Sequence, residues 1–296
     1  MARKKKAEPW QLYHQDCLDG IAQQLPKGEC KLAVYDPPYN IGQPYSDYVD
    51  RKTQREYLDF MEPRLSATYA HLHPHGSFWL AINTANQSEL DIMCKQIGFI
   101  PRNKIPWFFT FGQNNAKGFT NAHVTWLYYT KHRTRFTFNA DDPLNRLPSA
   151  RQMVYNDKRA NPKGRLPDNV WIIRPQQIPA AFEPHMDLWY FSRVCGTFKA
   201  KMVGVSPNQM PVPMLERIIR FCSNPGDLVC DAFLGTGTTG VAAVRMGRRF
   251  VGFDISKFCV QESEKRIAQA FDQIVPDDDV QLPLFGVSDK TKKGEK

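Results

Sequence analysis

The sequence lacks any long apolar run, which argues against a membrane protein. Its most hydrophobic stretches, such as "GSFWLAI" and "VTWLYY", are shorter than the about 18 residues that a membrane-spanning helix needs. The N-terminal segment "MARKKKAEPW" has no apolar core of the kind found in a signal peptide. We therefore expect a protein that does not enter a membrane and that lies in the cytoplasm.

Paired cysteine motifs are also missing. The chain has seven cysteines, an odd number, and none of them forms a C-x-x-C pair. Cys222, Cys230 and Cys259 lie within apolar stretches. This pattern is typical of core thiols in a reducing compartment and not of a disulfide framework.

Acidic residues are fewer than basic ones. The chain has 39 Lys and Arg against 30 Asp and Glu, which gives a net charge of +9. A basic surface suits a polyanionic partner, but a solvated cationic face explains the same excess. With 296 residues and 42% hydrophobic content, the chain is long enough for one large domain or for a domain with a sizeable insertion.

Apolar runs that alternate with helical patterns predict an open, mostly parallel α/β sheet. The expected strands and connections are "KLAVYD", "SFWLAI", "KIPWFFTF", "HVTWLYYT", "RFTFN", "LVCDAF" and "RRFVGFDI". No internal repeat is present. Between about Ala140 and Val205 the pattern loses its regular period and gains Arg and Pro, which indicates an inserted, specialised region.

Two segments have the apolar spacing of helices. One runs from Arg55 to His73, with Pro63 either near its first turn or at a kink and with Gly76 ending it. In the other, one face is marked by Leu215, Ile218, Ile219 and Cys222.

Three glycines follow the predicted strand "LVCDAF" and precede a predicted helix. Gly235, Gly237 and Gly240 form G-x-G-x-x-G, which lets backbone amides approach an anionic ligand at the start of a helix. Asp254 ends the next strand, where a carboxylate can accept two hydrogen bonds from a ribose. The pattern predicts a nucleoside ligand. It fits an NAD-dependent dehydrogenase as readily as a methyl-donor site, and a structural turn remains an alternative.

The corner "DPPY" follows the predicted strand "KLAVYD". Methylating an exocyclic amine of a base requires two acceptors that hold both N–H bonds in place. Asp36 can supply one, and the carbonyl of Pro37, fixed by restricted backbones, can supply the other. Tyr39 offers a flat face for stacking an extruded base. A turn that only ends the strand remains the structural alternative.

Together the two motifs resemble those of the β-class DNA amino-methyltransferases, which use S-adenosylmethionine. Asp36-Pro37-Pro38-Tyr39 looks like their catalytic D-P-P-Y motif, and "FLGTGT" from Phe233 looks like their F-x-G-x-G donor loop. The catalytic motif comes first, which marks the β class, whereas protein-glutamine methyltransferases carry N-P-P-Y after the donor loop. The resemblance covers most of the chain.

This resemblance implies a doubly wound, mostly parallel Rossmann-like methyltransferase sheet with an inserted target-recognition region, and S-adenosylmethionine as cofactor without a metal. The catalytic residues that it implies are Asp36, Pro37, Pro38 and Tyr39. The donor-binding residues that it implies are Asp16, Cys17, Asp231, Phe233, Gly235, Thr236, Gly237, Thr238, Thr239 and Asp254. Two departures are present: "SPNQMP" (206–211) replaces the frequent H-P-T-Q-K-P, and Asp254 replaces a glutamate.

The resemblance divides the chain into five parts. These are a basic flexible arm (1–10), the catalytic half of the methyltransferase domain (11–139), the target-recognition region (140–205), the donor-binding half (206–275) and a flexible tail (276–296).

The expected reaction is site-specific methylation of adenine N6 in duplex DNA after base flipping, as in restriction-modification. Cytosine N4 is the alternative base. Methylation of cytosine C5 needs a cysteine that follows a proline, and no Pro-Cys occurs. An NAD-dependent oxidoreductase leaves the proline corner unexplained, and a non-catalytic DNA-binding module would tolerate loss of Asp36.

Several other features suggest partners. Candidate DNA contacts are Tyr45, Tyr48, Arg51, Lys52, Arg151, Lys158, Arg159, Lys163 and Arg165, and solvated loop charge is the alternative for the basic ones. The tail "QLPLF" (Gln281 to Phe285) resembles peptides that dock on the bacterial replication sliding clamp, although it can also pack on its own domain. The resemblance also leaves open that the protein forms a homodimer, as some family members do. We expect His71, His73 and His75 to face solvent or a helix dipole and not to bind a metal.

Overall fold

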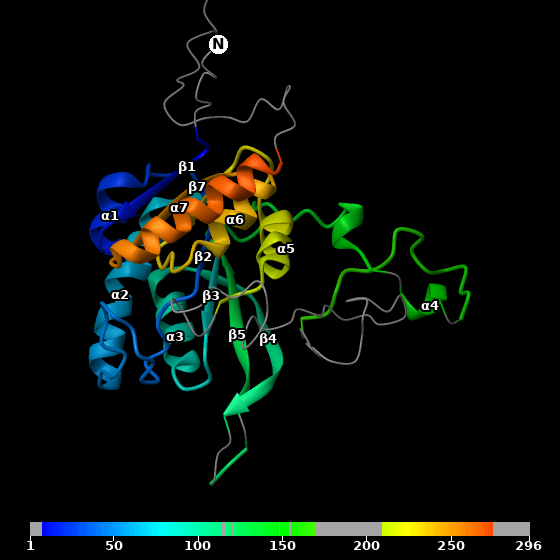
Figure 1. Cartoon of the computed structure of the whole chain (residues 1–296). Coiled ribbons are helices and arrows are strands. Elements are labelled where there is room, and N and C mark those ends of the chain that lie inside the picture. The colour runs from blue at the N-terminus through cyan, green and yellow to red at the C-terminus, as the bar shows by residue number, and fades with distance from the viewer. Residues whose placement is uncertain are drawn as a thin grey trace, which may run out of the picture.

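Seven strands form one mixed sheet in the order β1-β7-β6-β2-β3-β5-β4 (Figure 1). The structure, a computed structural model, describes residues 8–113, 117–119, 121–147, 149–153, 155–169 and 209–274. The strands are β1 (Trp10–His14), β2 (Cys30–Tyr35), β3 (Leu72–Ile82), β4 (Ile100–Gln113), β5 (Asn121–Thr130), β6 (Leu228–Asp231) and β7 (Arg249–Asp254). From β1 to β3 all neighbours are parallel, and β5 is antiparallel to both of its neighbours. The doubly wound, mostly parallel sheet predicted from the sequence is confirmed.

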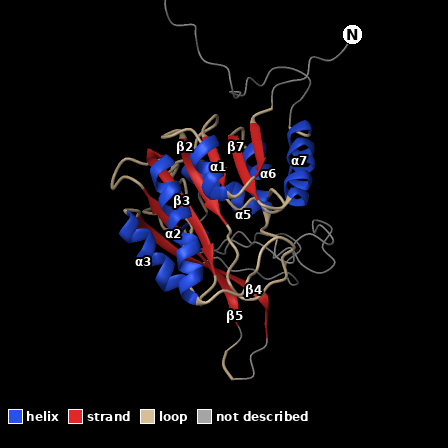
Figure 2. Ribbon diagram, turned by 90° about the vertical axis from the view of Figure 1, so that its left-hand side faces the viewer, coloured by secondary structure: helices blue, strands red, loops and turns tan. Residues whose placement is uncertain are grey.

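Helices cover both faces of the sheet (Figure 2). The helices of one layer are α1 (Cys17–Gln24), α2 (Gln54–His71) and α3 (Gln87–Ile97). Those of the other layer are α5 (Val212–Cys222), α6 (Thr238–Arg245) and α7 (Lys257–Asp272). Each layer closes a separate apolar core against the sheet.

Strand β2 lies in the middle of the sheet and is buried on both sides. Leu32 and Val34 pack into the core under α5 to α7, whereas Ala33 and Tyr35 pack into the core under α1 to α3. A strand of this kind has a continuous apolar sequence instead of an alternating one. The prolines that follow cannot donate to a ladder, so the strand ends and Asp36 lies at its carboxyl end, as predicted.

Strand β3 begins directly after helix α2, earlier in the chain than the sequence suggested. The helix begins after Thr53, which forms a capping box, and it ends at His71. The next residue, Leu72, already pairs with Cys30 of β2 and so belongs to the sheet. Gly76 therefore lies inside β3 and does not end the helix. Pro63 lies in the interior of the helix, not in its first turn.

Strand β1 places the start of the chain beside β7. Trp10, which is 5% exposed, packs edge-to-face on Phe271 at 5.3 Å and donates its indole N–H to Glu264 at 2.9 Å. Strand β1 therefore begins at Trp10, the last residue of the segment 1–10 that was expected to be a flexible arm. These contacts with α7 explain why, since they bury the indole.

The segment "RFTFN" forms no strand. The backbone N–H of Asn139 donates to the carbonyl of Phe221 in α5 at 2.8 Å, and Phe138 stacks on Phe221 at 4.9 Å. The segment thus packs on a helix, which offers it no ladder of strand hydrogen bonds.

The described part of the predicted recognition region, 140–169, has little regular structure. It contains the short helices η1 (Pro143–Asn145) and α4 (Ala150–Met153) and one isolated bridge between Leu147 and Arg165. It extends away from the sheet beyond α5 (Figure 1). Residues 170–208 lie outside the described residues, so the boundaries of this region stay a prediction.

Two further expectations concern membranes and cysteines. Within the described ranges no helix is both long and apolar enough to span a membrane. The described cysteines are free thiols, five buried (Cys17, Cys30, Cys94, Cys222, Cys230) and one half-buried (Cys259).

Close packing of α1 on β7 leads to a first prediction. A Cβ atom at Gly20 would lie 2.4 Å from the Phe253 ring, so Gly20→Val should lower the free energy of unfolding in urea by about 3 kcal/mol through overpacking. Ala22→Val, on the exposed side of the same helix, should cost only about 0.5 kcal/mol from helix propensity. Equal losses for the two variants would contradict the packing explanation.

Candidate active site

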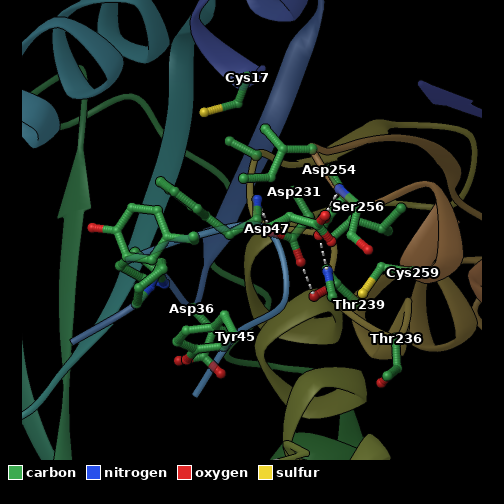
Figure 3. A pocket seen from close by; sticks show the side chains of 18 of the residues that line it. Cys17, Asp36, Tyr45, Asp47, Asp231, Thr236, Thr239, Asp254, Ser256 and Cys259 are labelled. Atoms are coloured by element: carbon green, nitrogen blue, oxygen red, sulfur yellow. Dashed lines mark hydrogen bonds between the residues drawn. The ribbon is translucent and has the colours of Figure 1, made fainter. Parts of the chain in front are cut away.

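The carboxyl ends of β1, β7, β6 and β2 open into a cavity of about 700 Å³ (Figure 3). This volume lies in the range of about 300–1,000 Å³ that is typical of small-molecule sites. All the predicted catalytic and donor-binding residues except Gly237 line the cavity: Asp16, Cys17, Asp36, Pro37, Pro38, Tyr39, Asp231, Phe233, Gly235, Thr236, Thr238, Thr239 and Asp254. The fold therefore brings the two sequence motifs together, and the role of each residue stays a prediction.

The glycines of the G-x-G-x-x-G loop serve different structural purposes. Gly235 has φ 51° and lines the cavity, and a Cβ there would have no atom closer than 3.9 Å. Gly237 has φ 74°, and its Cβ would lie 2.7 Å from Ser263 of α7. A Cβ at Gly240 would lie 2.3 Å from Ile267. Only the first glycine leaves space for a ligand, whereas the other two allow α6 to pack on α7.

Asp231 holds the start of the glycine loop. Its carboxylate accepts hydrogen bonds from the Thr239 hydroxyl at 2.6 Å and from the Phe233 N–H at 3.0 Å. Burial raises the pKa of Asp231 to about 7, against these hydrogen bonds, and the charge of Asp254 raises it further. Both oxygens are thus engaged within the loop, so Asp231 shapes the loop from the cavity wall.

Helix α7 fixes the same loop from the other side. The Ser263 hydroxyl donates to the carbonyl of Gly235 at 3.0 Å, and the Arg266 guanidinium donates to the carbonyl of Thr236. These contacts orient the loop carbonyls toward α7.

Two carboxylates lie at the ends of β7 and β1. Asp254 accepts the N–H of Gly235 on one oxygen and that of Ser256 on the other, each at 2.8 Å. Asp16 caps α1 and forms an ion pair with Arg64 at 2.6 Å. Each carboxylate is thereby held in one orientation at the edge of the cavity.

The carbonyls of the D-P-P-Y corner are not equivalent. The Tyr57 hydroxyl donates to the Pro38 carbonyl at 2.7 Å, and the Asn86 amide donates to the Tyr39 carbonyl at 3.2 Å. Among the described residues, none donates to the carbonyl of Pro37. The Pro38 and Tyr39 carbonyls of the corner are therefore occupied, whereas the carbonyl of Pro37, a residue that lines the cavity, is left without a donor among the described residues.

Asp36 lies next to that acceptor. Its carboxylate accepts the Tyr39 hydroxyl at 2.5 Å. Burial raises the pKa of Asp36 to about 7, Tyr39 lowers it in part, and the negative charge of Asp231 adds to the increase. An aspartate with this pKa is poised between its neutral and ionised forms near neutral pH.

The corner continues into a closed loop, residues 40–52. The buried carboxylate of Asp50 accepts the backbone N–H groups of Asn40 at 2.8 Å, Ile41 at 3.1 Å and Gln43 at 2.9 Å. The Asn40 side chain bonds both main-chain groups of Lys52, and its own backbone has φ 58°, which asparagine tolerates better than most residues. Asn40 and Asp50, neither of them singled out in the sequence, therefore fix this loop beside Asp36.

The predicted DNA contacts on this loop separate into two groups. Tyr45 and Tyr48 line the cavity. Arg51 and Lys52 do not line it, and the Lys52 ammonium lies 4.8 Å from the centre of the Tyr48 ring.

The basic residues of the recognition region are mostly exposed, but two of them have acidic partners. Arg151, Lys158 and Lys163 are exposed. Arg159 pairs with Asp157 at 3.0 Å, and Arg165 pairs with Asp168. Their contacts with DNA stay a prediction.

Two other predicted features lie wholly or partly outside the described residues. The tail peptide Gln281 to Phe285 lies wholly outside them. Of the departure "SPNQMP", residues 206–208 are also outside, but Gln209 and Met210 line the cavity.

The three histidines lie at the opposite end of β3 from the cavity. His71 ends α2, whereas His73 and His75 belong to β3 and not to a helix end as expected. The Lys31 ammonium lies 3.0 Å from Nε2 of His73. In the described part of the chain, no group of three metal-binding side chains comes together.

Sequence reasoning missed the residues that support the site. Tyr57 and Arg64 lie one heptad apart on the buried face of α2 and reach the corner and Asp16 respectively. The signal available in the sequence was that these two polar side chains occupy positions with the spacing of the buried face of the predicted helix. Asp50 and Asn86 gave no such signal, since their partners are backbone groups, which the residue types do not reveal.

Comparison with known proteins then identifies the family. The profile of the DNA methylase family of N6 and N4 enzymes matches residues 30–265 of the chain. The chain belongs to this family. Among curated relatives, the methylase is 29% identical to the type II methyltransferase M.HpaI of Haemophilus parainfluenzae over 84% of this chain and 71% of that one. It is 30% identical to M1.MboII of Moraxella bovis over 85% and 94% of the chains, respectively. It is 27% identical to the DNA adenine methyltransferase YhdJ of Escherichia coli over 86% and 82%.

Solved structures agree on the fold. The methylase superposes on M1.HpyAVI, solved as its complex with SAM, with a TM-score of 0.58 at 20% identity over 87% of this chain and 98% of that one. The PvuII cytosine-N4-specific DNA methyltransferase gives a TM-score of 0.61 at 18% identity over 90% and 93%. Both share the Rossmann-like sheet of the methylase.

The hydrogen bonds to Asp50 give a second prediction. Asp50→Ala removes the acceptor of the N–H groups that close loop 40–52, so the loop should open more often. Trypsin should then cleave after Arg51 or Lys52 on the order of tenfold faster, since a hydrogen bond to a charged group contributes about 1.5–3 kcal/mol. Asp59→Ala, at an exposed position of α2, is the control, and equal cleavage of both variants would show that the loop is held in another way.

Proposed function

We propose that this methylase transfers a methyl group from S-adenosylmethionine to the N6 amine of adenine in duplex DNA, with the base turned out of the helix. The observation that carries the proposal is the position of Asp36 and the free Pro37 carbonyl in one cavity with the glycine loop. Two acceptors beside a nucleoside-type loop match the needs of amine methylation.

The donor half of the cavity fits S-adenosylmethionine. Gly235 leaves open space where a side chain would project, and the end of β7 presents Asp254 to a ribose. Asp16, held by Arg64, is available for the amino group of the donor adenine. The donor supplies a methyl group on a positively charged sulfur, so no metal or covalent enzyme intermediate is required.

The catalytic half orients the amine. The Asp36 carboxylate and the Pro37 carbonyl each accept one N–H, which turns the nitrogen lone pair toward the donor side. Asp36 already accepts the Tyr39 hydroxyl on one oxygen, which leaves the second oxygen for the base. The Tyr39 ring supplies a stacking face worth about 1–3 kcal/mol. Cys17, the cysteine in this wall, has its pKa raised to about 12 by burial, so it remains a thiol and not a nucleophile.

Adenine is the base that the D-P-P-Y corner favours. The Escherichia coli relative is a DNA adenine methyltransferase, which supports the same choice. Cytosine N4 is the second candidate, because the PvuII enzyme with the same fold is cytosine-N4-specific and the two acceptors suit either amine. The type II relatives support a place in restriction-modification, with region 140–205 reading the sequence.

Expression in a methylation-free bacterial host, followed by single-molecule sequencing of its DNA, tests the reaction and the base together. We expect N6-methyladenine in one short sequence context. Asp36→Ala should abolish it, because the amine loses an acceptor, while purified Asp36→Ala should still bind S-adenosylhomocysteine and DNA. N4-methylcytosine instead would overturn only the choice of base, and full activity of Asp36→Ala would falsify the catalytic role.

The raised pKa of Asp36 predicts the pH dependence. The carboxylate form accepts the N–H, and its fraction rises with pH through the pKa of about 7. The kcat/KM for DNA methylation should therefore increase from pH 5.5 and level off above about pH 8, with a slope of one on a logarithmic plot.

Asp231 has a similar pKa and serves as the control for this assignment. The rise should persist in the residual activity of Asp231→Asn. A profile that is flat in the wild-type protein, or one that loses its rise in Asp231→Asn, would contradict the assignment to Asp36.

A further inference from the structure

Loop 40–52 spans the two halves of the cavity. It starts beside Asp36 at the end of β2, where Asn40 and Asp50 fix it. Its middle residues, including Tyr45, Ser46 and Asp47, line the same cavity as Ser256 and Phe258, which follow β7. Since β6 lies between β2 and β7 in the sheet, the loop passes from the catalytic corner across to the donor side.

Asp47 is the residue of this loop that reaches the end of β7. The hydroxyl of Ser46 donates to the exposed carboxylate of Asp47 at 2.5 Å. Ser46 and, next, Ser256 hold the pKa of Asp47 below its usual value. Asp47 also lies close enough to Asp254 for its charge to raise the pKa of Asp254. Figure 3 shows Asp47, Asp254 and Ser256 together at one side of the cavity.

Two neighbouring carboxylates repel each other, and His14 is a basic group that interacts favourably with both. The ring of His14 also bonds the carbonyl of Ile255. Each oxygen of Asp254 already accepts one backbone N–H. A ribose presents two adjacent hydroxyl donors, and a second carboxylate beside Asp254 gives each hydroxyl an acceptor of its own.

We infer that Asp47 is a second donor-binding carboxylate, which accepts a ribose hydroxyl of the bound nucleoside opposite Asp254. The inference rests on the proposed use of S-adenosylmethionine and assigns to this loop a residue that acts on the donor. Because Asn40 and Asp50 fix the same loop beside the D-P-P-Y corner, a donor held by Asp47 contacts the loop that also forms the wall of the base site.

Calorimetric titration of the full chain with S-adenosylhomocysteine tests this assignment without any need for activity. Asp47→Ala should raise the dissociation constant on the order of tenfold, as expected for the loss of one hydrogen bond to a charged group. Asp59→Ala removes an exposed carboxylate on α2, outside the cavity lining, and should leave the dissociation constant unchanged.

Deoxy analogues separate a direct contact from a general effect on the loop. The 2′-deoxy and 3′-deoxy forms of S-adenosylhomocysteine should bind the wild-type protein more weakly. The analogue that lacks the hydroxyl bonded by Asp47 should bind wild type and Asp47→Ala equally, because the hydrogen bond to Asp47 is already missing. If Asp47→Ala weakens all three ligands by the same factor, the carboxylate acts only through the loop and the inference is wrong.

The outcomes also distinguish this inference from the proposed function. Unchanged affinity of Asp47→Ala for S-adenosylhomocysteine, with tight binding by the wild type, overturns the inference alone. Absence of binding by the wild-type chain overturns the proposed function and the inference with it.

Discussion

Parallel pairing of β2 with β6 is the constraint on which the site depends. β2 lies near the start of the chain and β6 near its end, and Ala33 of one pairs with Cys230 of the other. Parallel strands end on the same edge of a sheet, so the D-P-P-Y corner and the glycine loop come out side by side. The negative charge of Asp231 contributes to the raised pKa of Asp36, which is a direct consequence of this contact. Neither motif forms a site alone.

Anchoring of the corner decides which of its groups remain available. The fixed φ angles of two prolines restrict the backbone, but stiffness alone does not select an acceptor. Tyr57 and Asn86 engage the carbonyls of Pro38 and Tyr39, the two residues that follow Pro37. The carbonyl that remains is the one next to the buried carboxylate. Tyr57 of α2 and Asn86, which precedes α3, thus occupy two carbonyls of the corner and leave that of Pro37 available for the role proposed for it.

Local motifs made part of this arrangement predictable from the sequence. A continuous apolar strand ended by two prolines, and glycines between a strand and a helix, carry their structural meaning within about ten residues. Features that depend on contacts between distant segments of the chain were not predicted. Gly76 looked like a helix end because β2 is far away in sequence, and Trp10 looked like part of a loose arm because α7, its partner, is at the other end of the chain.

The glycine loop shows the same limit on a smaller scale. In the sequence its glycines are equivalent, and both Gly235 and Gly237 were assigned to the donor. In the structure Gly237 and Gly240 accommodate Ser263 and Ile267 of α7, and only Gly235 faces open space in the cavity. The pattern predicted the type of turn, but the reason for each glycine depends on the packing of a helix that the pattern does not contain.

Charge is distributed unevenly between the site and the rest of the chain. The protein carries a net charge of +9, yet its cavity is lined by Asp16, Asp36, Asp47, Asp231 and Asp254, with Arg64 as its one basic side chain among the described lining residues. Burial raises the pKa of two of these carboxyls, Asp36 and Asp231, to about 7, because an ionised carboxylate loses solvation there and its charge becomes costly. Under the proposed function, the sulfonium group of the donor relieves that cost, and the net positive charge of the chain attracts the phosphates of DNA. One uncharged base can then enter the acidic site while the phosphates stay outside it.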